Sequence, residues 1–136
     1  MALTAVTPDF INRMRAVLPE TALRGADPHY FEEPRGRWRG EAGVVVAPQT
    51  VNQVADVITA ANAARVPVVP YGGGTGLVGG QIYPDGPAPV LLSLERMSAI
   101  RAVYPDENLM IAESVVAVDA TADAAIARCA AALRKN

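Results

Sequence analysis

The sequence predicts a small α/β unit followed by a β-hairpin, and three observations support the α/β unit. A β-branched run at Val44–Val46 is typical of a buried strand. Apolar residues then recur at helical spacing from Val51 to about Ala64, and a second β-branched run follows at Val68–Val69. Strand, helix and strand over so short a stretch form a βαβ unit, whose strands should be parallel with a right-handed crossover.

Both helices predicted in the N-terminal half have recognisable start signals. Thr50 and Gln53 form a capping box for the helix of the βαβ unit. An earlier helix begins with Thr7 as its N-cap and Pro8 at its first position, and it ends before Pro19. Its apolar stripe consists of Phe10, Ile11, Met14, Val17 and Leu18. The stripe predicts that this helix packs on the domain that follows.

The rest of the chain is predicted as a series of short elements. In order, they are a surface connection at 83–89, a strand at 90–92, a single helical turn over 94–100, a hairpin of strands 101–104 and 109–113 joined by a turn at 105–108, and an Ala-rich helix at 121–134. Glu113, at the end of the hairpin, is expected to face a neighbouring strand.

Composition places the chain among globular proteins and excludes several functions. Its 136 residues are enough for about one domain, and 51% of them are hydrophobic. The formal net charge of −2 argues against a dedicated nucleic-acid binder. Because Cys129 and His29 are the only residues of their kinds, we expect no internal disulfide, no cysteine-based zinc site and no two-histidine metal site. Cys129 is interpreted as a small core residue and His29 as a turn or cap residue.

The N-terminal residues and the hydropathy pattern bear on the cellular location of the protein. The first residues lack the basic and apolar regions of a secretory signal. No stretch approaches the roughly 18 uninterrupted apolar residues that a membrane span needs. We therefore expect a cytoplasmic protein with no membrane span.

A cluster of arginines precedes the βαβ unit. Arg35, Arg37 and Arg39 alternate around Trp38, the only tryptophan. This pattern suits contact with phosphate or stacking on an aromatic ring. A solvated loop anchored by Trp38 is the alternative.

A glycine-rich stretch after the second β-branched run is the main candidate binding site. Six of the eleven glycines lie between Gly72 and Gly80. Glycine allows positive φ and close approach of a ligand to the backbone, and successive N–H groups in a concavity bind anions. The hydroxyl of Thr75 can donate to a phosphate oxygen. These features favour a phosphate or pyrophosphate loop at the carboxyl end of a parallel strand, whereas a flexible surface loop is the alternative.

Two common nucleotide-binding loops do not fit this stretch. A P-loop needs a lysine, and none lies near. The dinucleotide fingerprint G-x-G-x-x-G is present at Gly74–Gly79, but it must open a helix, and Pro84 and Pro87 follow too soon. Glu95 lies near the distance expected of a ribose-binding residue, yet no helix precedes it. The remaining class is a loop that surrounds pyrophosphate with backbone amides alone.

Several motifs in this order resemble a known family. They are RGRWRG at 35–40, VVVAPQTVNQV at 44–54, VPVVPYGGGTGLVGG at 66–80, LSLERM at 92–97 and the stretch 108–113. Together they resemble the flavin-binding domain of the FAD-linked oxidases of the vanillyl-alcohol oxidase/PCMH superfamily. Within it, the chain is most similar to the D-2-hydroxyacid dehydrogenase branch, which includes D-lactate dehydrogenase, the glycolate oxidase subunit and D-2-hydroxyglutarate dehydrogenase. The resemblance covers about residues 29–113.

The resemblance implies an α+β fold with non-Rossmann FAD binding, in which the small α/β unit (βαβ plus hairpin) is the N-terminal subdomain. Residues 1–37 would be an N-terminal helix and loop extension, and 38–136 a partial PCMH-type FAD-binding domain. The pyrophosphate would be held by Gly72–Gly76, with support from Gly79 and Gly80. The implied FAD-binding residues are Pro70, Tyr71, Gly72, Gly73, Gly74, Thr75, Gly76, Leu77, Gly79 and Gly80.

The resemblance also implies a reaction. The flavin N5 would accept a hydride equivalent from C2 of a small D-2-hydroxy acid, which becomes the 2-oxo acid. No catalytic residue is assigned to this chain, because in the family the catalytic and substrate-binding residues belong to a cap domain beyond the matched region. We expect the chain alone to bind FAD weakly or not at all and to lack turnover.

Two positions depart from the family pattern. Relatives often carry Asn at the position of Gly74, and they carry a Gly soon after the position of Glu113, where this chain has none before Val118. The match to the family fades beyond Glu113, and we expect the chain to be a fragment, a truncated product or a degenerate copy of this subdomain. A non-enzymatic α/β interaction module is the alternative function, since an unfinished domain should bury its open face by self-association or on a partner.

Overall fold

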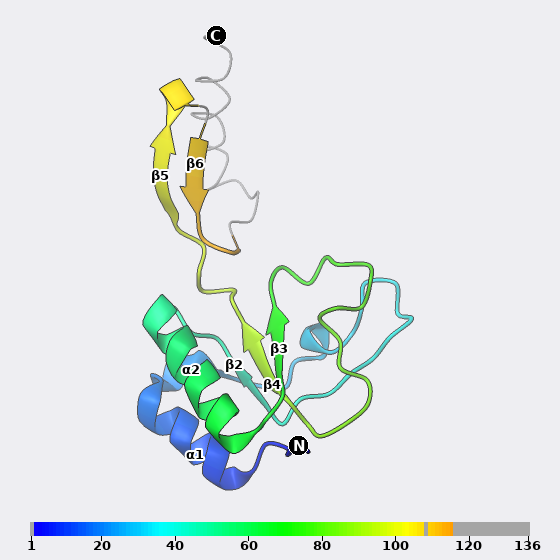
Figure 1. The fold of residues 1–136 in the computed structure, drawn as a ribbon. Coiled ribbons are helices and arrows are strands. Elements are labelled where there is room, and N and C mark those ends of the chain that lie inside the picture. Colours follow the sequence, from blue (N-terminus) through cyan, green and yellow to red (C-terminus); the bar gives the residue numbers. More distant parts are fainter. Residues whose placement is uncertain (1, 108, 116–136) are drawn as a thin grey trace. The chain divides into compact units, whose positions relative to one another are not determined.

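The computed structural model describes residues 2–107 and 109–115 of the chain (Figure 1). These residues divide into two compact units, one ending at Arg96 and one beginning at Met97. The first unit contains both helices and the larger sheet, and the second contains the hairpin. A domain boundary after residue 37 stays a prediction.

A four-stranded sheet in the order β1-β2-β4-β3 forms the centre of the first unit. Its strands are Leu23–Arg24 (β1), Val44–Val46 (β2), Val68–Tyr71 (β3) and Val90–Ser93 (β4). β2 and β3 both run parallel to β4, and β1 is antiparallel to β2. The predicted parallel direction of β2 and β3 is confirmed, with β4 lying between them. Their carboxyl ends therefore meet at one edge of the sheet.

The two helices begin and end as the sequence predicts. In α1 (Pro8–Val17), the Thr7 hydroxyl accepts a hydrogen bond from the Phe10 N–H. In α2 (Val51–Ala64), the Thr50 hydroxyl accepts one from the Gln53 N–H, and the chain leaves the helix through a left-handed residue, Arg65, with φ 55°. The Gln53 side chain returns to the N–H of Gln49 rather than to that of Thr50, so the capping box is displaced by one residue.

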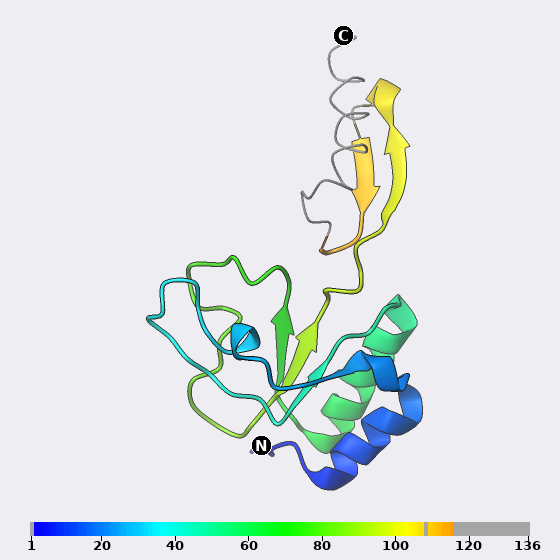
Figure 2. The same ribbon diagram turned by 180° about the vertical axis from the view of Figure 1, so that it is seen from behind.

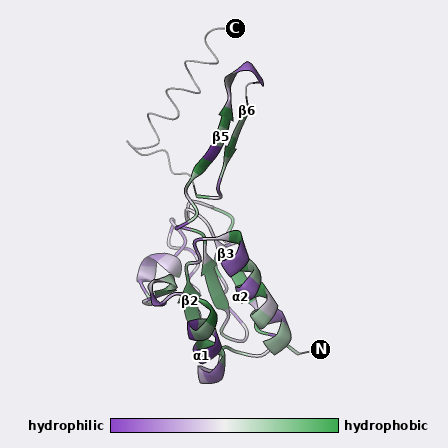
Figure 3. Ribbon diagram, turned by 90° about the vertical axis from the view of Figure 1, so that its left-hand side faces the viewer, coloured by the Kyte–Doolittle hydropathy of each residue, from purple (hydrophilic) through white to green (hydrophobic). Residues whose placement is uncertain are grey.

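Both helices cover one face of the sheet (Figures 1 and 2). The core between them is apolar, and it confirms that α1 packs on the domain that follows. Its buried residues are Phe10, Met14, Leu18, Ala22, Val46, Val57, Ala60, Ala61, Val66, Val90 and Leu92. Figure 3 shows β2 as hydrophobic, whereas α1 and α2 carry both hydrophobic and hydrophilic residues. The prediction is wrong for Val17, which was expected in the apolar stripe of α1 but is exposed.

The opposite face of the sheet carries a smaller core under the irregular segments. Tyr30, Val45, Tyr71 and Leu91 are buried there. Val45 and Leu91 alternate with Val46 and Leu92 because successive strand residues point to opposite faces. This second face supports the glycine-rich stretch and the segment that contains His29.

Three features of the first unit differ from the sequence prediction or were not part of it. Residues 94–99 form no helical turn: the Leu94 N–H donates to the Tyr71 carbonyl, which continues the pairing of β4 with β3 beyond Ser93. The two-residue strand β1 was not predicted. Two short 3-10 helices, Glu20–Ala22 and Pro28–Tyr30, interrupt segments whose patterns gave no regular element.

The second unit confirms the predicted hairpin. β5 (Ile100–Tyr104) pairs antiparallel with β6 (Leu109–Ala112), and a 3-10 turn at Pro105–Glu107 precedes the second strand. The Glu113 carboxylate accepts hydrogen bonds from the Ala99 N–H at 3.0 Å and from Arg101 at 2.9 Å. These bonds hold the pKa of Glu113 below its ordinary value. The predicted helix at 121–134, with Cys129, lies outside the described residues.

Candidate functional site

The glycine-rich stretch leaves β3 as an irregular loop. No helix is present between Tyr71 and Val90. The G-x-G-x-x-G at Gly74–Gly79 therefore does not open a helix, which agrees with its exclusion as a dinucleotide fingerprint. We call residues 72–81 the glycine loop.

The backbone N–H groups of the glycine loop are unused as donors within the described part of the chain. From Gly72 to Gln81, no N–H donates to another described residue, whereas the next one, that of Ile82, donates to the Gly79 carbonyl at 2.9 Å. Most residues of the loop are exposed, so these N–H groups can donate to solvent or to a ligand. A continuous run of available donors is what an anion-binding loop requires.

Two carbonyls of the same loop are engaged by a side chain. The amide nitrogen Nε2 of Gln81 donates to the carbonyl of Gly74 at 3.2 Å and to the carbonyl of Gly76 at 2.9 Å. The carbonyl oxygens of Gly74 and Gly76 are thus held by a side chain, whereas the backbone N–H groups of the loop are available to a ligand. Sequence reasoning missed Gln81, because a single glutamine beside a glycine run matches no motif.

Tyr71 forms the base of the loop. Its side chain is 7% exposed, and its hydroxyl donates to the His29 carbonyl at 3.0 Å. Gly74 has φ +70°, and a Cβ at this position would collide with the Tyr71 hydroxyl. By contrast, a Cβ at Gly72, Gly73 or Gly80 would meet nothing within 4 Å. The loop is therefore closely packed at Gly74 and open at Gly72, Gly73 and Gly80.

The other predicted site residues lie along the same segment. Pro70 is an exposed residue of β3, and Leu77 is also exposed. The ring of Trp38 approaches to 3.7 Å from where a Cβ of Gly79 would lie. Trp38 itself is 55% exposed, and neighbouring Arg39 pairs with Glu32 at 3.4 Å. The arginine segment, which contains Arg35, Arg37 and Arg39, thus lies beside the glycine loop at Trp38. Contact of these arginines with phosphate stays a prediction.

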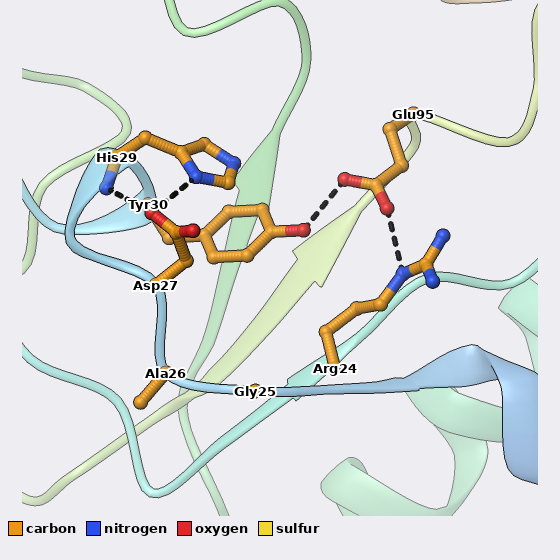
Figure 4. A pocket seen from close by; sticks show the side chains of 7 residues that line it. All are labelled: Arg24, Gly25, Ala26, Asp27, His29, Tyr30 and Glu95. Atoms are coloured by element: carbon orange, nitrogen blue, oxygen red, sulfur yellow. Dashed lines mark hydrogen bonds and ion pairs between the residues drawn. The ribbon is translucent and has the colours of Figure 1, made fainter.

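A pocket of about 480 Å³ lies beside the end of β4, and most of its lining residues carry polar or charged side chains (Figure 4). Its lining residues are Arg24, Gly25, Ala26, Asp27, His29, Tyr30 and Glu95. The Glu95 carboxylate is the centre of this group: it accepts hydrogen bonds from Arg24 at 2.7 Å, from the Tyr30 hydroxyl at 2.7 Å and from the Ser93 hydroxyl at 3.0 Å.

The charges of this pocket are balanced internally. Burial alone would raise the pKa of Glu95, but hydrogen bonds from Tyr30 and Ser93 and the charge of Arg24 outweigh it and lower that pKa. Burial, with the hydrogen bond to Glu95, raises the pKa of Tyr30. Glu95 is thus ionised at neutral pH and acts as an anchor for Arg24 and Tyr30. It joins β1 and the segment around Tyr30 to the end of β4.

His29 acts as a turn residue, as predicted. Its N–H donates to the Asp27 carboxylate at 3.1 Å, and its Nδ1 lies 2.8 Å from the same oxygen. The hydrogen bonds from His29 lower the pKa of Asp27. Among the described residues, no group of three or more His, Cys, Asp or Glu side chains is arranged to hold a metal ion. No helix in the described part of the chain is long and apolar enough to cross a membrane.

Comparison with known families identifies this architecture. Residues 42–131 match the model of the FAD binding domain. The chain belongs to this family. Its cofactor is therefore FAD, and the predicted resemblance to FAD-linked oxidases is confirmed.

The curated relatives are named as D-lactate and D-2-hydroxyglutarate dehydrogenases. The chain is 27% identical over 112 residues to a mitochondrial D-lactate dehydrogenase (cytochrome) of Arabidopsis thaliana, covering 79% of this chain and 19% of that protein. It is 32% identical over 111 residues to a D-lactate dehydrogenase of Anaerostipes hadrus, covering 78% and 22%. It is also 40% identical over 70 residues to a D-2-hydroxyglutarate dehydrogenase of Xanthomonas citri, covering 52% and 14%. The chain thus spans about a fifth of the length of the first two.

Solved structures confirm the predicted PCMH-type fold. An alkyldihydroxyacetonephosphate synthase superposes with a TM-score of 0.65 at 20% identity, covering 81% of this chain and 23% of that one. A substrate-bound p-cresol methylhydroxylase superposes with a TM-score of 0.65 at 18% identity, covering 94% and 27%. At these identities, the similarity establishes the fold alone.

The described residues fit part of an FAD molecule. A pyrophosphate needs several donors and close approach to the backbone. The glycine loop supplies N–H groups that no described residue accepts, and Gly72, Gly73 and Gly80 present no Cβ and no packed neighbour on the side where one would lie. A pyrophosphate is therefore the part of FAD that this loop suits.

Proposed function

We propose that this chain is the FAD-binding portion of a flavin-dependent oxidoreductase that converts a D-2-hydroxy acid into its 2-oxo acid. The glycine loop binds the pyrophosphate of FAD. The observation that carries the binding proposal is the uninterrupted run of N–H groups from Gly72 to Gln81 that donate to no described residue. The reaction is supported by the names of the relatives, which are D-lactate and D-2-hydroxyglutarate dehydrogenases.

Each residue of the proposed site has a role in binding. Backbone N–H groups of Gly72–Gly76 donate to phosphate oxygens, with the hydroxyl of Thr75 as a further donor and Gly79 and Gly80 closing the loop. A hydrogen bond to a charged group contributes about 1.5–3 kcal/mol, so a few such bonds account for a large part of the affinity. Pro70 and Tyr71 hold the start of the loop at the edge of the sheet, and exposed Leu77 offers apolar contact. When bound, the flavin supplies the hydride acceptor.

Substitution of Gly73 by alanine tests the binding proposal. Gly73 has ordinary φ and open space around a Cβ, so Gly73→Ala leaves the fold unstrained. In a loop that touches pyrophosphate, however, the new methyl group blocks close approach of the phosphates. In the protein expressed with any coding sequence that flanks these residues, we expect FAD binding, measured by quenching of flavin fluorescence, to weaken roughly tenfold or more, a loss of about 1.4 kcal/mol or more, with an unchanged thermal midpoint.

The matched control for this test is Gly25→Ala. Gly25 lies outside the loop and likewise has nothing within 4 Å of a Cβ. It should leave both FAD affinity and the thermal midpoint unchanged. Equal FAD affinity in the Gly73 variant and the wild type would argue against a pyrophosphate at this loop.

The substrate class is tested on the protein expressed from its gene with any coding sequence that flanks these residues. Reduction of the bound flavin is followed anaerobically after addition of D-lactate, D-2-hydroxyglutarate, glycolate or L-lactate. The proposal predicts bleaching of the flavin by at least one D-2-hydroxy acid and none by L-lactate. Bleaching by L-lactate alone would contradict the stereochemistry proposed here.

The exposed apolar residues of the hairpin favour a second candidate function, a self-associating module. Tyr104, Leu109 and Ile111 are each more than two-fifths exposed in the second unit. Apolar groups of this size gathered on one element are typical of an interface. Size-exclusion chromatography with and without FAD distinguishes the two functions, because association that ignores FAD would favour the module.

A further inference from the structure

We propose that Gln81 is a positioning residue that orients the glycine loop for pyrophosphate, so that the N–H groups of Thr75 and Leu77 face the phosphates. This inference rests on the proposed function of the loop and names the donors within it. It starts from the two hydrogen bonds of the Gln81 amide, to the carbonyls of Gly74 at 3.2 Å and Gly76 at 2.9 Å.

Peptide geometry connects these carbonyls to the donors. In a planar trans peptide, the C=O of one residue and the N–H of the next point in opposite directions. The chain contains no cis peptide bond among its described residues. Because Gln81 holds the carbonyls of Gly74 and Gly76 toward itself, the N–H groups of Thr75 and Leu77 point away from it. Neither N–H donates to any other described residue.

A glycine-rich loop needs such a restraint. Glycine peptides reorient at low steric cost, and a reoriented peptide would turn a carbonyl oxygen, which repels phosphate, toward the ligand. The primary amide of glutamine has two hydrogens and can satisfy two carbonyls at once. By fixing both peptides before the ligand arrives, Gln81 reduces the ordering cost of binding.

The neighbourhood of Gln81 is shaped for this contact. A Cβ at Gly76 would lie 2.9 Å from the Gln81 Oε1, so the absence of a side chain at residue 76 lets the amide approach the loop. Methionine has a similar length and leucine a shorter one, and neither has a donor or a charge. Substitution of Gln81 by either residue therefore removes its hydrogen bonds while an uncharged side chain stays at the position.

The test compares Gln81→Met with Gln53→Met in the full chain. Gln53 makes its hydrogen bond at the start of α2, through its Oε1 and outside the loop. Backbone ¹H–¹⁵N NMR spectra are recorded during titration with ADP, which carries the pyrophosphate, and with adenosine, which does not. For the wild type, we expect ADP to shift the Thr75 and Leu77 amides most, and adenosine to leave them in place.

For Gln81→Met, we expect ADP affinity to fall about tenfold, with loss of the Thr75 and Leu77 shifts and no change toward adenosine. Gln53→Met should keep the wild-type ADP affinity. If the spectrum of Gln81→Met shows that the chain has not folded, Gln81→Leu, which also removes the donor without adding a charge, replaces it, with the same expected loss.

The outcomes separate the two proposals. Wild-type amides of the loop that do not respond to ADP would overturn the pyrophosphate site itself. Wild-type amides that respond, together with an unchanged ADP affinity in a folded Gln81 variant, would overturn the role of Gln81 alone. A response centred on other amides of the loop, with Thr75 and Leu77 unmoved, would overturn the assigned donors.

Discussion

The hydroxyl of Tyr71 occupies the space in which a Cβ of residue 74 would lie. Tyr71 ends β3, so the glycine loop turns back over the last side chain of its own strand. The same hydroxyl donates to the His29 carbonyl, which joins the base of the loop to the segment around Tyr30. Packing at Gly74 therefore fixes the start of the loop on the sheet, whereas Gly72, Gly73 and Gly80 stay open.

The first prediction concerns Gly74→Ala. Its φ of +70° lies in the left-handed region, and its Cβ would meet the Tyr71 ring. We expect a loss of about 1–3 kcal/mol in the free energy of unfolding, since both strain and overpacking act there. Urea unfolding followed by the fluorescence of Trp38, the only tryptophan, measures it.

The double variant Gly74→Ala with Tyr71→Phe tests whether the collision contributes. Removal of the hydroxyl relieves the nearest contact but loses the hydrogen bond to His29. The combined loss should therefore be smaller than the sum of the single losses. Strict additivity would show that backbone strain alone makes residue 74 a glycine.

The second prediction concerns the pH dependence of stability through Glu95. Its folded-state pKa is lowered from the ordinary 4.5. The folded chain thus binds fewer protons than the unfolded chain, and the stabilisation is complete above pH 4.5 and is lost as pH falls through the lower folded value. Glu95→Gln should cost on the order of 1 kcal/mol at neutral pH, because the part-exposed carboxylate is screened by solvent.

Unfolding curves from neutral pH to about pH 3 check this prediction. The free-energy difference between wild type and Glu95→Gln should shrink as the pH falls. Glu41→Gln, at an exposed carboxylate, serves as the control, since it should reproduce the wild-type pH dependence. A difference that stays constant across the range would mean that Glu95 acts through shape rather than charge.

Local signals made part of the fold predictable. Thr7 and Thr50 cap their helices through contacts three residues away, and the hairpin forms around a short turn. Such contacts are encoded within a few residues, so a pattern reveals them. The place of β4 between β2 and β3 and the two-residue strand β1 depend on pairings between distant segments, which no local pattern specifies.

The candidate site was likewise predictable only where its features are encoded within a few residues. The glycine run, its place after a strand and the absence of a following helix were predictable, because prolines and glycines act locally. The contact of Arg24 with Glu95 spans 71 residues, and the Tyr71 hydroxyl reaches His29 across 42. Gln81 lies close in sequence to the carbonyls it holds, yet one amide beside a glycine run has no characteristic spacing. These side chains become visible only once the chain is folded.

The third prediction concerns the N-cap of α2. The Thr50 hydroxyl accepts from the Gln53 N–H at 3.2 Å, so Thr50→Ala leaves this N–H without its acceptor. We expect a loss of about 1 kcal/mol in the free energy of unfolding. Thr50→Ser, which keeps the hydroxyl, should lose much less. Helix content by circular dichroism should stay near that of the wild type in both, and an equal loss in the two variants would assign the effect to the methyl group of Thr50.

The last prediction concerns Gly40, which follows the three arginines and packs against Tyr83, two residues after the glycine loop. A Cβ at Gly40 would lie 2.8 Å from the Tyr83 nitrogen and 2.9 Å from the Tyr83 oxygen. These are backbone atoms and cannot rotate away, so Gly40→Ala must displace the segment that follows the loop.

We expect Gly40→Ala to cost about 1–3 kcal/mol in the free energy of unfolding, as overpacking does elsewhere. Because Gln81 lies two residues before Tyr83, the same displacement should also weaken binding of ADP at the glycine loop. Gly25→Ala, with nothing within 4 Å of its Cβ, should change neither property. Loss of stability in Gly40→Ala with unchanged ADP affinity would show that the loop holds its shape independently of the segment that returns from it.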